Sequence, residues 1–421
     1  MRPDGDRKIK VAFIKFGGLS AGGTERWLQM MAAALPRDRF EATYFYTDAA
    51  PYVGSDFRHP GTDPHRRAFM EEAGVKLVEV KVGAKDVSIR THDWRDTDLW
   101  ERFNPDAFDI VQAGKAGHVE FPFCRLTMPV VEYVTLGGVD LSPNIACTIH
   151  ASEWQRRQWI AGGGAAARSA VIPIPAAAPV TDSSLRGDLG IPSDALVAGF
   201  HQRANDEIYS PVPLAAFASI ECPGRFFVIM GGGESYRGQA AELGLKNVRF
   251  VAHSADPRIV SAFLNTVDVF AHGRRDGEFF GTVFAEAMRH RKPCISHLSP
   301  IANGHVEAIG PGGFVAVDQH SYAGLLSRLF ESAELRQRLG TDGFAFATAR
   351  YDIASCVDQL AGIYEKVFAQ GRERFAVAAE EPRSVRSRLA EFAARHHGAR
   401  RAVAAALPGP LVRYLRRAIR Y

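Results

Sequence analysis

The chain has 421 residues, of which 46% are hydrophobic and 23% charged, and this is the composition of an ordinary globular protein, not a disordered or fibrous one. A chain of this length is too long for a single hydrophobic core, and it is predicted to form about two to three domains. No stretch approaches the roughly 20 apolar residues that span a bilayer, and Met1–Lys10 lacks the features of a secretory signal, which predicts a cytoplasmic protein. Five scattered cysteines favour free thiols over disulfides or a zinc site.

Short apolar runs alternate with helical patterns in the first part of the chain, as expected for parallel strands that are covered by helices on both faces. Helices are expected between many of these strands, notably at Thr24–Leu35 and Ser152–Ala161. The order predicts a Rossmann-like lobe over residues 1–178. Its expected strands are Lys10–Phe16, Ala42–Thr47, Val75–Lys81, Asp109–Ala113, Val130–Val134, Ile145–Ile149 and Ala170–Pro173.

A proline-rich segment, Pro173–Pro192, interrupts this pattern and is interpreted as a linker. A second series of expected strands follows at Leu196–His201, Phe226–Met230, Val248–Ala252, Val267–Ala271, Pro293–His297 and Phe314–Val317. Its expected helices are Pro213–Ile220, Gln239–Leu243, Pro257–Asn265, Thr282–His290, Tyr322–Phe330 and the closing helix Ala354–Phe368. The predicted fold class is therefore α/β, with two tandem Rossmann-like lobes facing across a cleft, the second at residues 179–368. Because ligands bind beyond the carboxyl ends of such strands, this favours a two-substrate transfer enzyme.

Two glutamates with seven residues between them, Glu278 and Glu286, flank the expected start of a helix. The free N–H groups at that helix start, at Thr282 and Val283, favour a bound diphosphate, and Gly281 allows its close approach to the backbone. Glu278 is then placed to reach a donor sugar, and Glu286 to accept hydrogen bonds from ribose hydroxyls. A helix cap and a solvated face are the alternative interpretation.

This run resembles the EX7E motif of the retaining glycosyltransferases of family 4, which have the GT-B fold. Further segments between about residues 10 and 368 resemble the same family in order: Gly22–Glu25, Ile149–Trp154, Val171–Pro173, Phe227–Gly233, Val248–Phe250 and Tyr364–Val367. The resemblance implies that a sugar is transferred from a nucleotide diphosphate sugar to an acceptor hydroxyl with retention of configuration and without a metal. The acceptor classes that it leaves open are glycans, lipid-linked sugars and small molecules, and the implied setting is polysaccharide or glycoconjugate biosynthesis.

The resemblance also implies roles for single residues. Arg203 aligns with the arginine that grips the donor diphosphate, whereas Ile208 stands where the family usually has a lysine. Gly22 and Gly23 are expected to contact the phosphates or the acceptor through backbone N–H groups, unless they only form a tight turn. His118 is the candidate for the family's histidine near the acceptor, with an ordinary loop histidine as the alternative.

Two further groups have open interpretations. Arg274 and Arg275 either substitute for the missing lysine or form a solvated pair in a loop. Asp96–Asp98 spells DxD, a metal-binding signature of a different glycosyltransferase fold. Because it precedes a helical run, it is interpreted as a helix start, and no metal is implied.

The last segment, residues 369–421, is a basic tail. From Arg383 to Tyr421 it carries ten arginines and one acid, a net charge of +9. Because the whole chain has a net charge of +4, the rest of the chain has a net charge of −5. Its amphipathic pattern predicts peripheral contact with an anionic membrane, and the alternatives are packing on the protein's own acidic body or a partly disordered solubilising tail. Nucleic-acid binding is not expected. The alternative functions are a catalytically degenerate binding partner and a nucleotide-sugar epimerase or a phosphorylase on the same fold.

Overall fold

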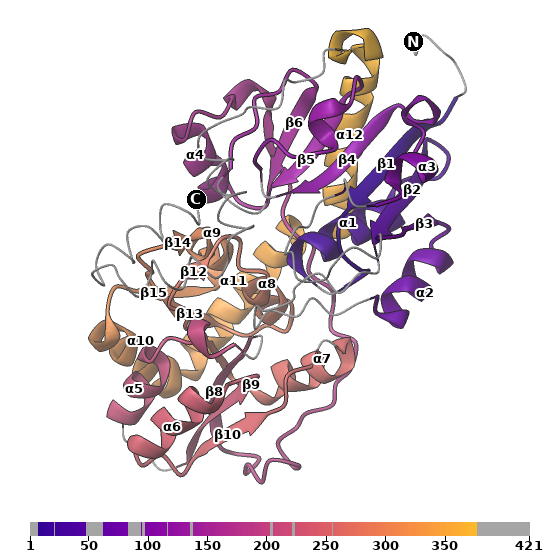
Figure 1. Ribbon diagram of the computed structural model, residues 1–421. Coiled ribbons are helices and arrows are strands. Elements are labelled where there is room, and N and C mark those ends of the chain that lie inside the picture. Colours follow the sequence, from indigo (N-terminus) through magenta and orange to yellow (C-terminus); the bar gives the residue numbers. More distant parts are fainter. Residues whose placement is uncertain are drawn as a thin grey trace, which may run out of the picture. The chain divides into compact units, whose positions relative to one another are not determined.

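The computed structural model describes residues 7–20, 22–47, 62–82, 94, 97–115, 117–134, 138–202, 205–220, 224–254 and 256–376. These residues form two compact units (Figure 1). Within the described ranges, the first unit takes the residues up to His150, Arg156–Ile172 and the chain from Val357 onward. The second unit takes Ala151–Gln155 and Pro173–Cys356.

The first unit is built on a parallel sheet of seven strands in the order β3-β2-β1-β4-β5-β6-β7. Its first six positions have the doubly wound order of a Rossmann fold, in which the chain reverses direction across the sheet between β1 and β4. The strands are β1 (Ile9–Lys15), β2 (Phe40–Thr47), β3 (Lys76–Val80), β4 (Ile110–Lys115), β5 (Val130–Val134), β6 (Ile145–His150) and β7 (Ser169–Val171).

The second unit repeats this arrangement with a parallel sheet of six strands in the order β10-β9-β8-β11-β13-β15. Here the reversal falls between β8 and β11. The strands are β8 (Leu196–His201), β9 (Arg225–Met230), β10 (Val248–Val251), β11 (Val269–Ala271), β13 (Cys294–His297) and β15 (Gly313–Ala316). A separate pair of two-residue strands, β12 (Gly277–Glu278) and β14 (Ala302–Asn303), lies outside this sheet. The predicted fold class of two Rossmann-like α/β lobes is thus confirmed.

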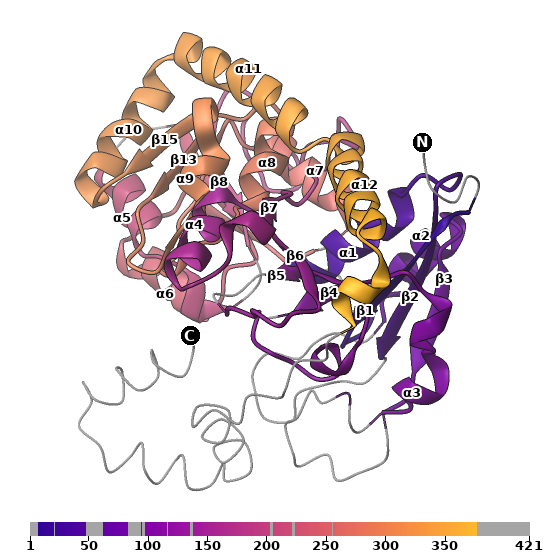
Figure 2. The ribbon, with the colours of Figure 1, turned by 90° about the horizontal axis from the view of Figure 1, so that it is seen from above.

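Helices cover both sheets. In the second unit, α5 packs against α10 on one side of the sheet, and α7 and α8 lie on the other side (Figure 2). The helices of this unit are α5 (Val212–Ser219), α6 (Glu234–Glu242), α7 (Pro257–Thr266), α8 (Thr282–Arg289), α9 (Gly304–Ile309), α10 (Gln319–Glu331) and α11 (Ala333–Arg350). The remaining helices are α1 (Gly23–Ala34), α2 (Pro64–Glu72), α3 (Leu99–Arg102), α4 (Glu153–Ala161) and α12 (Ile353–Ala369).

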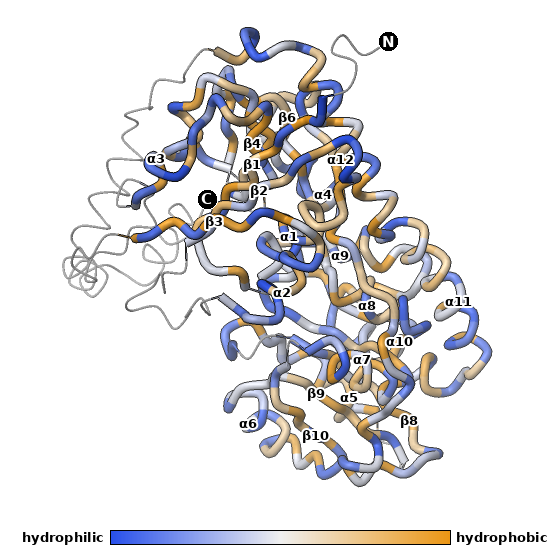
Figure 3. Tube along the Cα trace, turned by 90° about the vertical axis from the view of Figure 1, so that its right-hand side faces the viewer, coloured by the Kyte–Doolittle hydropathy of each residue, from blue (hydrophilic) through white to orange (hydrophobic). Residues whose placement is uncertain are grey.

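The central strands form the hydrophobic cores, and this is why the apolar runs of the sequence located them. Hydrophobic residues gather in the strands of each sheet, and hydrophilic ones on outer helices such as α6 (Figure 3). In the second unit every residue from Val197 to Phe200 is buried, as is every residue from Phe227 to Met230. Strands that are buried on both faces read as continuous apolar runs and not as alternating ones.

The last helix, α12, contributes its residues from Val357 onward to the first unit. Tyr364 is fully buried there and donates a hydrogen bond of 2.9 Å from its hydroxyl to Oε1 of Gln112 on β4. The next residue, Glu365, accepts a hydrogen bond of 2.7 Å from Arg39, which precedes β2. These contacts fasten the C-terminal part of the helix to the first sheet.

Helices α6, α9 and α11 of the second unit differ from the sequence-based expectation, and α9 was not predicted. Helix α6 begins at Glu234, directly after the glycine loop, and not at Gln239, because its first turn is too polar to show an apolar period. Helix α11 was not predicted. Its buried face consists largely of small residues, Gly340, Gly343 and Ala347, and Gly343 packs so closely that an added Cβ would lie 2.9 Å from Gly312 Cα. Small residues of this kind give no hydrophobic stripe.

The second aspartate of the DxD segment, Asp98, stands at a helix start, as expected. Helix α3 begins at Leu99, and Asp98 accepts a hydrogen bond of 2.7 Å from the backbone N–H of Lys81 and another of 2.7 Å from Arg102. The carboxylate of Asp98 is therefore engaged in local structure, whereas Asp96 lies outside the described residues.

None of the described helices combines the length and the apolar character needed to cross a membrane.

Candidate functional site in the second unit

The strongest candidate site lies at the point where the second sheet reverses its strand order. Strands β8 and β11 are neighbours there, and in such sheets ligands bind in the crevice beyond their carboxyl ends. Gln202 follows β8 directly, and His272 follows β11 directly. Both side chains are buried at this edge, at 8% and 1% exposure. The sequence signal that could have found them is a polar residue at the end of an apolar strand.

Glu278 is the residue on which these side chains converge. Gln202 Nε2 donates a hydrogen bond of 3.0 Å to Glu278 Oε1, and a guanidinium nitrogen of Arg274 lies 3.3 Å from the same oxygen. His272 Nε2 lies 3.5 Å from it. Glu278 itself is only 9% exposed. The structure therefore buries the first glutamate of the sequence motif among three nitrogen groups, one from the end of β8 and two from the stretch that follows β11.

These neighbours keep Glu278 ionised. Burial by itself would raise the pKa of its carboxyl group, but the positive charge of Arg274 outweighs that effect, and the contacts with His272 and Gln202 add to it. The pKa of Glu278 consequently falls to about 2. Burial also lowers the pKa of His272, even though Glu278 acts against that shift, so this imidazole is neutral near neutral pH. The site thus presents a permanent carboxylate.

Two glycines shape the loop that carries Glu278. Gly277 has φ +68° and pairs with Ala302 in the small β12–β14 sheet. Gly281 has φ +67° and is the N-cap of α8. Both conformations lie in the left-handed region that side chains disfavour. Thr282 and Val283, the first residues of α8, are partly buried and present the free N–H end of that helix next to the glutamate loop.

The loop should not tolerate a side chain at Gly277. An added Cβ would lie 1.8 Å from the carbonyl oxygen of Ala302, in a backbone conformation that is already strained for alanine. Gly277→Ala is expected to lower the free energy of unfolding of the second unit by about 2–4 kcal/mol, measured by urea denaturation.

The matched control for this substitution is Gly324→Ala, because Gly324 lies within α10 and no atom is within 4 Å of its added Cβ. This change should stabilise the helix by roughly 0.5–1 kcal/mol. If Gly277→Ala is as stable as the wild type, the loop is not held as tightly as the close approach to Ala302 indicates.

The second glutamate of the motif, Glu286, lies on the second turn of α8. Its Oε2 is 3.5 Å from Nε2 of His201, the last residue of β8, and the side chains of both residues are mostly buried. Glu286 thus reaches the carboxyl end of β8, the same edge of the sheet that carries Gln202. Its predicted contact with ribose hydroxyls stays a prediction.

The structure describes only some of the residues predicted to supply positive charge to the diphosphate. Arg203 lies outside the described residues, so its role stays a prediction. Ile208 is 7% exposed and belongs to the hydrophobic core of the second unit. Arg275 is exposed, and its backbone N–H and Nε donate hydrogen bonds to the carbonyl oxygens of Ile208 (2.9 Å) and Tyr209 (2.8 Å). Position 208 therefore supplies apolar packing in place of a charge.

A serine of the family-like segment 149–154 also supports the glutamate loop. Ser152, which belongs to the second unit, donates a hydrogen bond of 2.7 Å to the carbonyl oxygen of Phe279. The ring of Trp154 packs edge-on against that of Phe279 at 5.9 Å between centroids. This segment thus positions the backbone that directly follows Glu278.

The residues predicted in the first unit lie at the corresponding edge of its own sheet. Gly22 is the N-cap of α1 and Gly23 is its first residue, so both stand at the free N–H end of that helix, beyond β1. His118 is exposed in the loop that follows β4. Strands β1 and β4 are the neighbours at which the first sheet reverses its order. The proposed contacts of these three residues with phosphate or acceptor stay predictions.

A buried charge cluster at this edge was not predicted. Lys115, the last residue of β4, lies 2.5 Å from Asp140 Oδ2 and 2.9 Å from Glu132 Oε2, and the three side chains are at most 1% exposed. Ser142 donates to Asp140, and Thr148 donates a hydrogen bond of 2.7 Å to Glu132. Burial would lower the pKa of Lys115, but the two carboxylates raise it above the ordinary lysine value. The cluster ties the loop after β5 to the end of β4.

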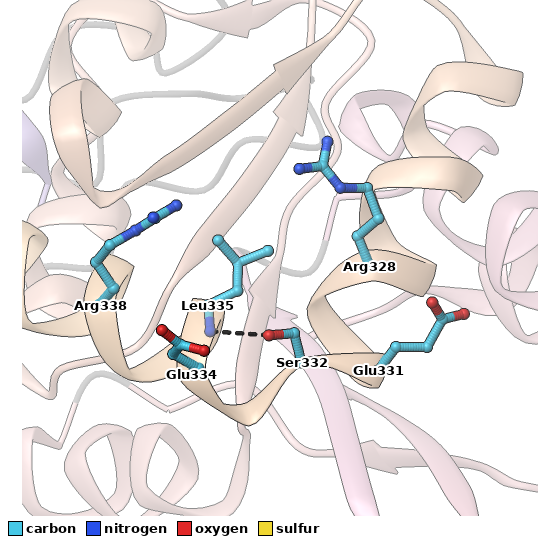
Figure 4. A pocket seen from close by; sticks show the side chains of 6 residues that line it. All are labelled: Arg328, Glu331, Ser332, Glu334, Leu335 and Arg338. Carbon is cyan, nitrogen blue, oxygen red and sulfur yellow. Dashed lines mark hydrogen bonds between the residues drawn. The ribbon is translucent and has the colours of Figure 1, made fainter.

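An open hollow in the second unit lies at the junction of α10 and α11 (Figure 4). Ser332 caps α11 there by accepting a hydrogen bond of 3.0 Å from Leu335. The charged side chains that line the hollow are Arg328, Glu331, Glu334 and Arg338. Its lining shares no residue with the glutamate loop, and helix capping accounts for its ordered polar contact.

Comparison with known proteins identifies a family that resembles the second unit. Residues 182–345, which include Glu278, Glu286 and α8, match the family of glycosyl transferases group 1. The second unit is similar to group 1 glycosyltransferases. A curated relative, alpha-D-kanosaminyltransferase from Streptomyces kanamyceticus, is 27% identical over 150 residues. That match covers 34% of this chain and 37% of the relative, so only about a third of the relative's length is spanned.

Solved structures extend the likeness of the fold to most of the chain. A glycosyltransferase from Rickettsia africae has a TM-score of 0.66 at 12% identity, covering 86% of this chain and 98% of that one. HepE from Anabaena, solved with UDP, has a TM-score of 0.63 at 19% identity, covering 85% of this chain and 100% of that one. Identities this low support the two-lobed fold alone.

Proposed function

We propose that this protein is a retaining glycosyltransferase of family 4 type, which transfers a sugar from a nucleotide diphosphate sugar to an acceptor hydroxyl. The observation that supports this most is the ionised, buried Glu278 beside the N-terminus of α8, at the strand-order reversal of a unit that matches the group 1 glycosyl transferases. The HepE structure holds UDP, and another structure of HepE holds UDP-glucose. A UDP-sugar is accordingly the first donor to test.

In the proposed reaction, the bond between the anomeric carbon and the diphosphate oxygen breaks, and the acceptor oxygen bonds to the anomeric carbon from the face that the diphosphate leaves. The proton of the acceptor hydroxyl passes to the departing diphosphate. The N–H groups at Thr282 and Val283, together with Arg203, stabilise the negative charge that develops on the leaving diphosphate. Glu278 orients the donor sugar, and Glu286 holds the ribose. Because the helix end and the arginine balance the phosphate charge, the proposed mechanism uses no metal.

The proposed acceptor is a glycan, a lipid-linked sugar or a small molecule, in the biosynthesis of a polysaccharide or glycoconjugate. A cytoplasmic protein that touches the inner face of the membrane through residues 383–421 fits a lipid-linked acceptor. That tail lies outside the described residues.

A thermal-shift screen of the purified protein against nucleoside diphosphates and nucleotide sugars tests the donor site. Free ligand at about 100 times its Kd stabilises the native state by about 2.7 kcal/mol, which corresponds to roughly 5–10 °C for a unit of this size. A shift of this kind is expected for one nucleoside diphosphate and for its sugars, and Arg203→Ala should abolish it. If no compound on the panel shifts the melting temperature, the transferase proposal fails.

A second candidate function is a non-catalytic binding protein on the same fold, and the burial of Ile208 favours it. The family's lysine position has become part of the core here, so that one of the usual diphosphate contacts cannot form. Selective nucleotide-sugar binding without release of nucleoside diphosphate, with all candidate acceptors absent or present, would support this alternative.

A further inference from the structure

Arg274 stands out among the charged residues of the second unit because carboxylates engage each of its three guanidinium nitrogens. Its Nε and one terminal nitrogen form a fork with the two oxygens of Asp276, at 2.8 Å and 2.5 Å. The other terminal nitrogen lies 3.3 Å from Glu278 Oε1. The side chain is 10% exposed. A guanidinium held in this way is a poor partner for a phosphate, since its donors would first have to leave two carboxylates.

The backbone fixes Arg274 in addition to its side chain. The residue forms an antiparallel bridge with Tyr209, and Tyr209 donates a hydrogen bond of 3.2 Å from its hydroxyl to the carbonyl oxygen of Gln202. Tyr209 also accepts a hydrogen bond of 2.7 Å from Gly232 N–H. The same buried tyrosine therefore connects the strand end that carries Gln202 with the loop that carries Arg274. Both donors to Glu278 belong to one rigid arrangement.

The two oxygens of Glu278 are treated differently by this arrangement. Gln202, Arg274 and His272 all approach Oε1, whereas no described residue donates a hydrogen bond to Oε2. An ionised carboxylate has about four lone-pair sites, so Oε2 can accept further hydrogen bonds beyond those that the described residues make. An oxygen without a described donor, on the loop that leads into α8, is available to a ligand.

We propose that Arg274, locked by Asp276, is a positioning residue that pins Oε1 of Glu278 and thereby aims Oε2 at a hydroxyl group of the donor sugar. This inference rests on the proposed function and adds to it a positioning role for Arg274 and Asp276. The arginine acts on the sugar through Glu278 and is not the substitute for the lysine missing at position 208. Arg274 and Asp276 together leave one net negative charge, that of Glu278, at the sugar position.

The groups that face Glu278 determine how this device responds to pH. Arg274 and Asp276 lie on its own loop, His272 follows β11 and His305 lies on α9, and His297 on β13 neighbours these two histidines. Burial lowers the pKa of each of the three histidines, to about 4 for His305, and this favours their neutral forms. Without Arg274, burial would raise the pKa of Glu278, and the carboxylate would form only at higher pH.

The test compares the binding of UDP with that of UDP-glucose by calorimetry, since only the second ligand carries the sugar. Arg274→Gln is expected to leave the Kd for UDP within about twofold and to weaken UDP-glucose binding by about tenfold to a hundredfold, the worth of a hydrogen bond to a charged group. The loss should shrink as the pH rises from about 6 to about 8.5, whereas wild-type binding stays flat over that range. Arg274→Lys keeps the positive charge but cannot form the two-pronged contact with Asp276. It should restore pH-independent binding of UDP-glucose and part of the affinity for that ligand.

The matched control is Arg338→Gln, which removes an exposed arginine of the same unit at the hollow of Figure 4. It should leave both affinities unchanged. Equal weakening of UDP and UDP-glucose by Arg274→Gln would make Arg274 a diphosphate-binding cation and overturn the proposal. Unchanged binding of both ligands would overturn it as well.

A ligand-free measurement separates this inference from the proposed function. If wild-type protein binds neither UDP nor UDP-glucose, the donor assignment fails, but the pinning of Glu278 can still be measured by thermal unfolding of Arg274→Gln, Glu278→Gln and the double variant. Because Arg274→Gln leaves a buried charge unpaired, the double variant should be more stable than Arg274→Gln alone at neutral pH. Strictly additive losses in this cycle would show that Arg274 does not act through Glu278.

Discussion

Glu278→Gln is expected to lower the turnover of the transfer reaction by about 10²–10³-fold while the protein stays folded, the usual cost of removing one preorganised electrostatic group. Glutamine has the shape of glutamate and can still accept a hydrogen bond from Gln202 or Arg274 through its amide oxygen. It lacks the permanent charge that the site holds at neutral pH, where the pKa of Glu278 is about 2. The measurement is the release of nucleoside diphosphate from the nucleotide sugar that the thermal screen selects.

A surface glutamate provides the control for this variant. Glu242 is exposed at the end of α6, and Glu242→Gln should retain full turnover. Glu278→Ala should lose at least as much activity as Glu278→Gln. Full activity of both Glu278 variants, with their melting temperatures intact, would remove Glu278 from the mechanism and favour the binding-protein alternative.

Lys115→Met is expected to lower the free energy of unfolding of the first unit by about 3–5 kcal/mol, the typical loss when one partner of a buried ion pair is removed. The change leaves Glu132 and Asp140 buried without their shared cation. Four of the five tryptophans belong to the first unit, so urea denaturation followed by tryptophan fluorescence reports mainly on that unit. Lys76→Met, an exposed change on β3, is the control and should have little effect.

The pH dependence of Lys115→Met distinguishes a lost charge from lost packing. In the wild type, Lys115 lowers the pKa of Asp140 despite its burial. Without the lysine, burial raises the pKa of both carboxyl groups above their unfolded values, and such groups stabilise the fold at low pH and lose that contribution as pH rises. The deficit should therefore be larger near pH 8 than near pH 5. Adding Asp140→Asn should recover part of it. A deficit independent of pH would assign the effect to packing.

Local sequence patterns determined the elements and their order. Apolar runs located each strand of both large sheets within about two residues, because strands covered on both faces must be apolar throughout. The spacing of Glu278, Gly281 and Glu286 predicted a loop followed by a helix, and α8 does begin at Thr282. The α/β class and the two lobes follow from the order of these elements. Helix α11 escaped this reasoning because small residues make up much of its buried face.

Only the tertiary structure decided what surrounds the key charges. Gln202 lies 76 residues before Glu278 in the sequence, and it meets His272 and Glu278 because β8 and β11 are neighbours in the sheet. Lys115 likewise gains its partners from β5 and from the loop after it. A periodic pattern records which side of an element is apolar, but a polar residue looks the same in sequence whether it faces water or a buried partner. Which charges are paired is fixed by strand order and loop closure, which are long-range properties of the folded chain.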